Sequence, residues 1–168
     1  MSRHWFHLPF LVCALLLPLS AEAQTGAALE IDQNRIKQSL QNCLEGTGGD
    51  QESDSSQARS CTRSYFAQCS EAGGSTAAQQ RACWGALESY WASVVAQRGK
   101  RIEGVAPANL KRYVQDSARA EERYRKERCQ FYRYLQGAWT GPAEARCLTD
   151  TLIDRAVDLQ VIQENMPR

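Results

Sequence analysis

Histidine is scarce in this sequence. Its two histidines, His4 and His7, both lie in a segment, residues 1–23, that has the features of a signal peptide. The mature chain, residues 24–168, then contains no imidazole, the group that proteins use most often as a proton shuttle and as a metal ligand. We therefore expect a protein that is not an enzyme and that holds no cofactor and no metal ion.

Long apolar runs are scarce as well. The run from Leu8 to Leu19 follows Arg3 and is too short to cross a bilayer as a helix. Small residues at Ala21-Glu22-Ala23 suit a signal peptidase, so we expect cleavage after Ala23, with an N-terminal membrane anchor as the alternative. The mature protein is expected in the periplasm or outside the cell, with no membrane span.

A large excess of charge of one sign is also missing, because 20 basic residues face 19 acidic ones. Such a balance gives no signal for nucleic acid or for a membrane surface as partner. The stretch from 107 to 136 is basic, but Asp116, Glu122 and Glu127 interrupt its basic face. We interpret that face as solvated surface.

Helical patterns account for nearly all of the mature chain. Apolar residues recur at helical spacing in five stretches: about Ala27–Leu44, about Ser56–Ala72, Thr76 to a connection at Gly99–Ala106, about Pro107–Gln136, and from near Pro142 onward. Thr76 and Gln79 have the spacing of a capping box. The sequence predicts one all-α domain over residues 24–168, a small bundle of about five helices arranged as hairpins.

The fourth helix is expected to bury a long apolar arc. Its members are Leu110, Tyr113, Val114, Ala118, Tyr124, Phe131, Tyr132 and Leu135. Glu121 and Arg125 fall inside the same arc, four residues apart. They predict either a polar pocket for a ligand or, as we favour, a buried ion pair that holds two helices in register, and Arg155 is a third candidate for this network.

Six cysteines remain in the mature chain, and six allow fifteen pairings. Helix ends narrow the choice, because antiparallel hairpins bring some cysteines level. We favour pairing Cys43 with Cys61, Cys69 with Cys83, and Cys129 with Cys147. A zinc or redox site is the weaker alternative, because the sequence has no C-x-x-C and no mature histidine.

Two features could contact a partner. Trp139 lies in the turn Gly137–Gly141, where a large aromatic side chain either anchors an interface or, as we favour, caps the hairpin beneath it. Asp150, Asp154 and Asp158 form an acidic outer row on the fifth helix. This row could meet a cationic protein such as lysozyme, although a solvated face is the default interpretation.

The order of several residues resembles a known family. Gly73-Gly74-Ser75-Thr76 before Cys83, a helix with Trp91, Tyr124-Arg125 before Cys129, and Cys147-Leu148 before Arg155 and Leu159 are similar to the LprI-like lysozyme inhibitor family. Its members are small secreted bacterial proteins, named for a lipoprotein that inhibits lysozyme. The resemblance implies an exported binding protein whose partner is lysozyme or another envelope macromolecule. The alternative is an envelope structural or adaptor protein without inhibitory activity.

Overall fold

The computed structural model describes residues 32–46, 55–135, 137 and 139–166. These residues form helices α1 (Gln33–Gly46), α2 (Ser55–Gly73), α3 (Ala77–Val105), α4 (Ala108–Gln130) and α5 (Thr140–Glu164), with a 3₁₀ helix, η1 (Phe131–Tyr134), after α4. No strand occurs in the described ranges, so the predicted all-α bundle is confirmed. The predicted signal peptide and the predicted first turn of the first helix, 27–31, lie outside them.

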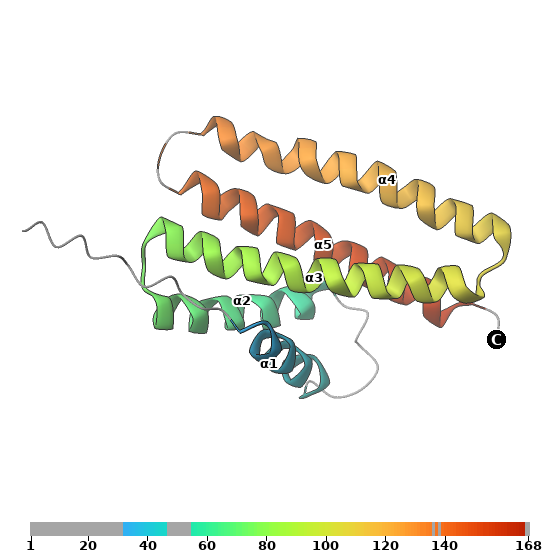
Figure 1. Cartoon of the computed structure of the whole chain (residues 1–168), viewed down its shortest axis with the longest axis horizontal. Coiled ribbons are helices and arrows are strands. Elements are labelled where there is room, and N and C mark those ends of the chain that lie inside the picture. Colours follow the sequence, from blue (N-terminus) through green and yellow to red (C-terminus); the bar gives the residue numbers. More distant parts are fainter. Residues whose placement is uncertain (1–31, 47–54, 136, 138, 167–168) are drawn as a thin grey trace, which may run out of the picture.

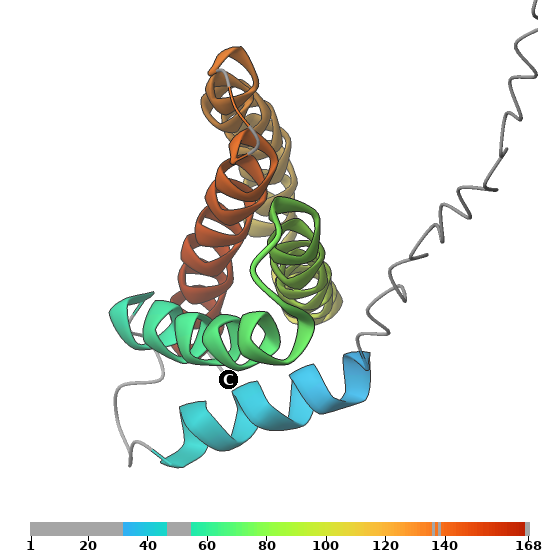
Figure 2. The same cartoon turned by 90° about the vertical axis from the view of Figure 1, so that its left-hand side faces the viewer.

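Helices α3 and α5 form the centre of the molecule. They run side by side along most of their length, and α4 lies along α5 (Figure 1). Helices α1 and α2 cover the opposite side (Figure 2). Trp91 of α3 packs with Ile153 and Ala156 of α5 and with Ala58 of α2 in the middle of the core. The other three helices, α1, α2 and α4, each contact α3, α5 or both.

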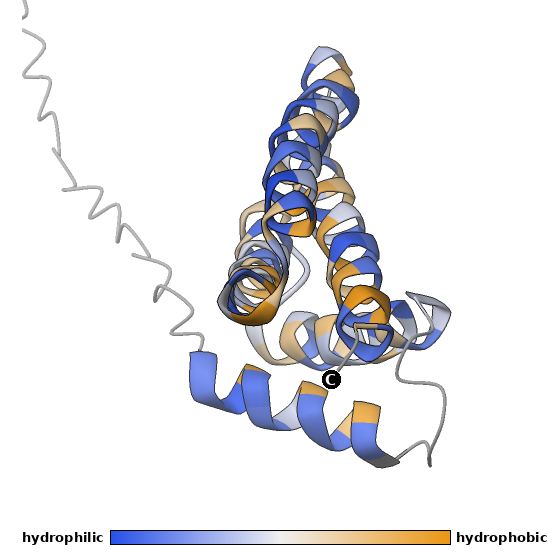
Figure 3. Ribbon diagram, turned by 90° about the vertical axis from the view of Figure 1, so that its right-hand side faces the viewer, coloured by the Kyte–Doolittle hydropathy of each residue, from blue (hydrophilic) through white to orange (hydrophobic). Residues whose placement is uncertain are grey.

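Helix α1 is held by a narrow apolar face. Ile36 and Leu40 are fully buried and pack with Tyr65 of α2 and Leu87 of α3. The rest of α1 is polar, and its hydrophobic segments lie on the side turned toward the other helices (Figure 3). The predicted positions Ile36 and Leu40 are therefore confirmed as core residues.

Three disulfides join helices that are neighbours in the chain. Cys43–Cys61 links α1 to α2, Cys69–Cys83 links α2 to α3, and Cys129–Cys147 links α4 to α5, with Cα–Cα distances of 5.8, 6.0 and 5.5 Å. The favoured pairing is confirmed for all six cysteines. Each bridge closes a short loop, for which the chain-entropy model gives a stabilisation of about 3 kcal/mol.

The turn between α2 and α3 follows the sequence pattern. Gly74 has a φ of +98°, a conformation that costs side chains other than glycine, so the helix ends there. Thr76 is the N-cap of α3, and its hydroxyl accepts a hydrogen bond from the Gln79 amide at 3.3 Å. The Gln79 side chain accepts the Thr76 amide in return at 3.2 Å, which completes the predicted capping box.

The predicted connection at Gly99–Ala106 is wrong. Helix α3 continues through Gly99 to Val105, and the turn is shortened to Ala106 and Pro107. Ile102 is fully buried and packs with Val114 of α4 and Leu159 of α5. This burial stabilises the last turns of α3 by more than the two glycines destabilise them.

The predicted fourth helix also needs correction. The α-helix ends at Gln130, and Phe131–Tyr134 continue as the 3₁₀ turn. Of the predicted buried arc, only Val114 is buried, whereas five of its members are exposed: Tyr113, Ala118, Tyr124, Phe131 and Leu135. The reason is that α4 packs mainly against one helix, α5, which is too narrow to cover so wide an arc.

The fifth helix begins at Thr140, two residues before the predicted start, so that Pro142 lies in its first turn, where a proline removes no helical hydrogen bond. None of the helices in the described ranges is long and apolar enough to cross a membrane.

Candidate functional site

Arg155 is the centre of a polar network between α4 and α5. Its guanidinium donates hydrogen bonds to Glu121 Oε1 at 2.9 Å, to Ser117 Oγ at 3.0 Å and to the Val114 carbonyl at 3.3 Å. The Arg155 side chain is 9% exposed and that of Glu121 40% exposed. The network joins α5 to the middle of α4.

The Cys129–Cys147 disulfide and the Glu121–Arg155 ion pair fit the same alignment of α4 against α5. Glu121 lies eight residues before Cys129, and Arg155 lies eight residues after Cys147, so both pairs are level in an antiparallel arrangement. Cys129–Cys147 thereby fixes the register in which Glu121 meets Arg155. The structure brings these two predicted residues together.

Arg125, the third residue of the predicted network, is not part of it. Within the described residues it forms no hydrogen bond or ion pair, and Glu121 bonds Arg155 instead. The charge of Arg125 acts on Glu88 of α3, where it opposes the rise in pKa that burial imposes on that carboxyl. The expected contact between Glu121 and Arg125 is therefore wrong, because Arg155 reaches Glu121 from the facing helix.

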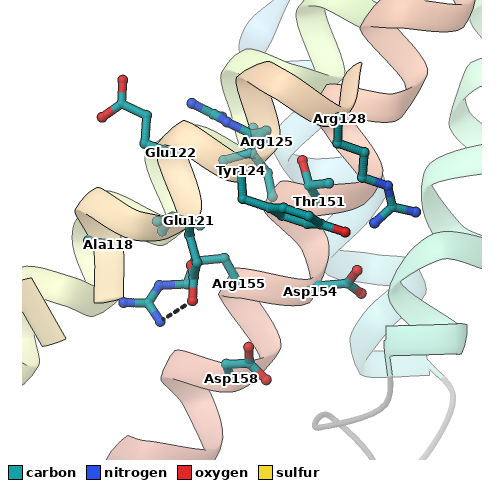
Figure 4. A pocket seen from close by; sticks show the side chains of 12 residues that line it. Ala118, Glu121, Glu122, Tyr124, Arg125, Arg128, Thr151, Asp154, Arg155 and Asp158 are labelled. Atoms are coloured by element: carbon teal, nitrogen blue, oxygen red, sulfur yellow. Dashed lines mark hydrogen bonds and ion pairs between the residues drawn. The ribbon is translucent and has the colours of Figure 1, made fainter. Parts of the chain in front are cut away.

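A pocket of about 350 Å³ lies where α4 meets α5, with Val95 of α3 also in its lining. Figure 4 shows how its charged side chains are arranged. Tyr124 extends from α4 toward α5, Arg128 lies beside it, and Asp154 and Asp158 come from α5. Glu122 and Arg125 of α4 also line the pocket.

The electrostatics of the pocket are set by partial burial. Desolvation raises the pKa of Glu121 above its ordinary value, Arg155 opposes that rise, and the negative charge of Asp158 adds to it. The Arg128 guanidinium lies 5.9 Å from the centre of the Tyr124 ring, within the range of a cation–π contact. The pocket therefore has a negative end near Glu121 and Asp158 and a positive end at Arg128.

The predicted acidic row is not a free outer face. Asp154 forms an ion pair with Arg59 of α2, and Asp150 lies 3.8 Å from Arg146. Burial raises the pKa of Asp150, which the charge of Arg146 opposes. Asp158 is exposed, the side chain of Asp154 is 44% exposed despite its ion pair, and that of Asp150 is 30% exposed. The prediction of an outer row is wrong here because α5 is a central helix, with neighbours on several sides.

The end of the α4–α5 hairpin lies far from α1 (Figure 2) and exposes several large apolar side chains. Trp139 is 55% exposed there and is the N-cap residue of α5 by backbone only, so it does not cap the hairpin as a buried aromatic would. Three more exposed side chains of this end are Phe131, Tyr134 and Leu135. We call these four residues the hairpin-end surface. Trp139 and the acidic row are separated along α5 and do not form one surface.

Sequence reasoning missed several of these residues. Tyr134 fell outside the predicted arc because the backbone changes to a 3₁₀ turn at Phe131 and shifts the helical phase. Thr151 lines the pocket where α4 packs on α5, and helical spacing within α5 alone does not single it out. Arg59 is 95 residues from its partner Asp154 and could not have been found by spacing.

In the described ranges, no group of three or more histidine, cysteine, aspartate or glutamate side chains is arranged to hold a metal ion. Comparison of the chain with protein-family models, with curated proteins and with solved structures gave no match.

Proposed function

We propose that this protein is an exported, disulfide-stapled binding protein rather than an enzyme, and that the hairpin-end surface is its contact site. The observation that carries the proposal is the clustering of Phe131, Tyr134, Leu135 and Trp139 as exposed side chains at one end of a hairpin that Cys129–Cys147 holds closed. Clustered exposed aromatics are typical of protein interfaces, where they supply most of the binding energy.

Export agrees with the cysteine usage. Three disulfides in one small chain are typical of a periplasmic or secreted protein, because the cytosol keeps thiols reduced. The sequence features of residues 1–23 support the same location.

Lysozyme is the partner we propose to test first, since the resemblance of the sequence implies it. The active site of lysozyme is a cleft that holds two carboxyl groups. From Arg123 to Arg146 the chain has six basic and two acidic side chains, of which Arg123, Arg125 and Arg128 have no ion pair among the described residues, and the aromatic side chains of the hairpin end are exposed. A basic, aromatic hairpin end complements an acidic cleft, which is why we place the contact here and not at the acidic row.

The test is lysis of a bacterial cell-wall suspension by lysozyme in the presence of the oxidised mature protein. We expect inhibition that is lost on reduction and alkylation, and a drop of at least about tenfold in potency for Trp139→Ala, as for an interface anchor. Tyr113→Ala is the matched control, because Tyr113 is an equally exposed aromatic on α4 outside the hairpin-end surface.

Full potency of Trp139→Ala would remove the hairpin-end surface from the proposal. Absence of inhibition against several lysozyme types would leave the alternative, an envelope structural or adaptor protein. A pull-down of envelope components, with Trp139→Ala as the negative bait, would then test whether the same surface binds another partner.

A further inference from the structure

We propose that the pocket between α4 and α5 binds a short peptide of two or three residues with free termini. The pocket is distinct from the hairpin-end surface, so this site stands or falls independently of the proposed function. The proposal rests on three properties of the pocket: its volume, the charges at its two ends, and its aromatic and apolar middle.

The volume fits a small ligand and not a folded partner. The pocket holds about 350 Å³, which is at the lower end of the range for small-molecule sites. Leu152 of α5 and Ala118 of α4 contribute apolar lining, and the Tyr124 ring contributes an aromatic wall (Figure 4). An apolar side chain in the middle of a ligand would be removed from water here.

Several pocket charges are already neutralised by the protein. Glu121 pairs with Arg155, Asp154 with Arg59, and Glu122 with Lys126. Three lining charges remain without an ion pair among the described residues: the guanidinium groups of Arg125 and Arg128 and the carboxylate of Asp158. The pocket is therefore suited to a ligand that carries an anion at one end and a cation at the other.

The spacing of Arg128 and Asp158 sets the length of the ligand. Taking Glu121 and Arg155 as level, Asp158 of α5 lies level with Ala118 of α4, and Arg128 lies ten residues further along α4. Both side chains lean back toward the N-termini of their helices, and hence toward each other. This leaves about 10 Å between the charged groups. An extended peptide spans at most about 3.5 Å per residue, so a tripeptide matches this gap and a dipeptide nearly does.

The experiment is calorimetric titration of the oxidised mature protein with the tripeptide Ala-Leu-Ala. For a ligand of this size we expect a Kd on the order of 0.1–1 mM. N-acetylation of the peptide should remove the contact with Asp158, and C-terminal amidation the contact with Arg128. Each blocked form should bind about tenfold more weakly.

Variants of the protein test the same two contacts from the other side. Arg128→Gln should remove the preference for a free carboxylate, and Asp158→Asn the preference for a free amine. Both side chains are exposed, and circular dichroism checks that the fold persists. The matched controls are Arg123→Gln and Glu127→Gln, exposed charges on α4 outside the pocket, which should bind Ala-Leu-Ala as the unaltered protein does.

Three results would overturn the proposal. These are no binding of Ala-Leu-Ala at several millimolar, equal binding of the free and doubly blocked peptides, and equal losses in the pocket and control variants. Because none of these measurements involves Trp139 or lysozyme, their failure is distinguishable from failure of the proposed function.

Discussion

At the scale of single residues, the core depends on one buried hydrogen bond between α2 and α3. Trp91 Nε1 donates to the Thr62 hydroxyl at 3.0 Å, and that hydroxyl donates to the Ala58 carbonyl at 2.7 Å. All three residues are buried. The pair fixes the rotation of α2 against α3, because the indole reaches an acceptor in only one arrangement of the two helices.

Removal of the acceptor should therefore be costly. Thr62→Val keeps the volume but leaves the Trp91 N–H buried without a partner, so we expect a loss of about 1–3 kcal/mol in the free energy of unfolding, measured by urea denaturation. Trp91→Phe in the Thr62→Val background should cost less than Trp91→Phe alone, because the hydrogen bond is already gone. Additive losses in this double-mutant cycle would contradict the coupling.

Glu121 is the residue for which we expect a pH effect. Its pKa lies above the ordinary value of 4.5, so the folded protein binds this proton more tightly than the unfolded chain does. The stability that follows is complete below the ordinary pKa and is lost as pH rises through the folded pKa. As pH rises above the ordinary pKa of a glutamate, Glu121→Gln should therefore lose less stability than the unaltered protein.

The control for this measurement is its neighbour on α4. Hydrogen bonding to Lys126 lowers the pKa of Glu122, so Glu122 contributes stability that is present above its ordinary pKa and is lost as pH falls. Glu122→Gln should thus change the pH dependence in the opposite direction. The same direction for both variants in urea denaturation at several pH values would show that the environment of Glu121 has been misjudged.

At the scale of helices, a substitution at Gly99 tests whether α3 continues past this residue. An alanine Cβ at Gly99 meets no atom within 4 Å, and the position is inside a helix. Gly99→Ala should therefore raise the free energy of unfolding by about 0.5–1 kcal/mol. Gly74→Ala is the opposite case, because φ is +98° and its Cβ would lie 2.7 Å from Gln79 Oε1. We expect it to lower stability by at least about 1 kcal/mol. If Gly99→Ala does not raise the free energy of unfolding, the chain at Gly99 would be a loop and not part of α3.

Helix α4 is the element most dependent on a covalent link. It contacts α3 weakly and is held to α5 by Cys129–Cys147 and by the Arg155 network. Replacement of both cysteines by alanine should cost about 3 kcal/mol. Hydrogen exchange should then show faster exchange in α4, while α3 and the second half of α5 stay protected.

The control for α4 is the equivalent double replacement at Cys69 and Cys83, which should affect the α2–α3 turn and leave the exchange of α4 unchanged. Uniform loss of protection in both variants would mean that the protein opens as one cooperative unit and that α4 is no more independent than the other helices.

At the scale of the whole molecule, the sequence was informative wherever a signal is local. Gly74, the Thr76 capping box and the three cysteine pairs across short turns were predictable because each depends on residues close together in the chain. The end of α3 was not, because Ile102 is buried by residues of α4 and α5 that helical spacing within α3 does not reveal. Packing between distant segments overrode the helix-breaking tendency of the glycines.

The candidate site was likewise predictable where the signal is local and not where it depends on packing between distant segments. The polar character of Glu121 and Arg155 was predictable from their positions at the core face of their helices. Their direct contact, the exposure of Trp139 and the pairing of Asp154 with Arg59 depend on how many neighbours each helix has. A wide apolar arc on α4 was interpreted as core, and the small number of helices that α4 packs against leaves it as surface.

The largest prediction concerns all three disulfides together. Their combined entropic stabilisation is about 9 kcal/mol, which is comparable to the 5–15 kcal/mol by which a whole domain is stable. Reduction should therefore leave a chain that is marginally folded at best. In thermal unfolding followed by circular dichroism, the oxidised protein should show a cooperative transition, and the reduced protein a broad loss of helicity at a much lower temperature. An unchanged transition after complete reduction, verified by mass, would show that packing around Trp91 and Ile153 suffices to hold the bundle and that the disulfides serve another purpose.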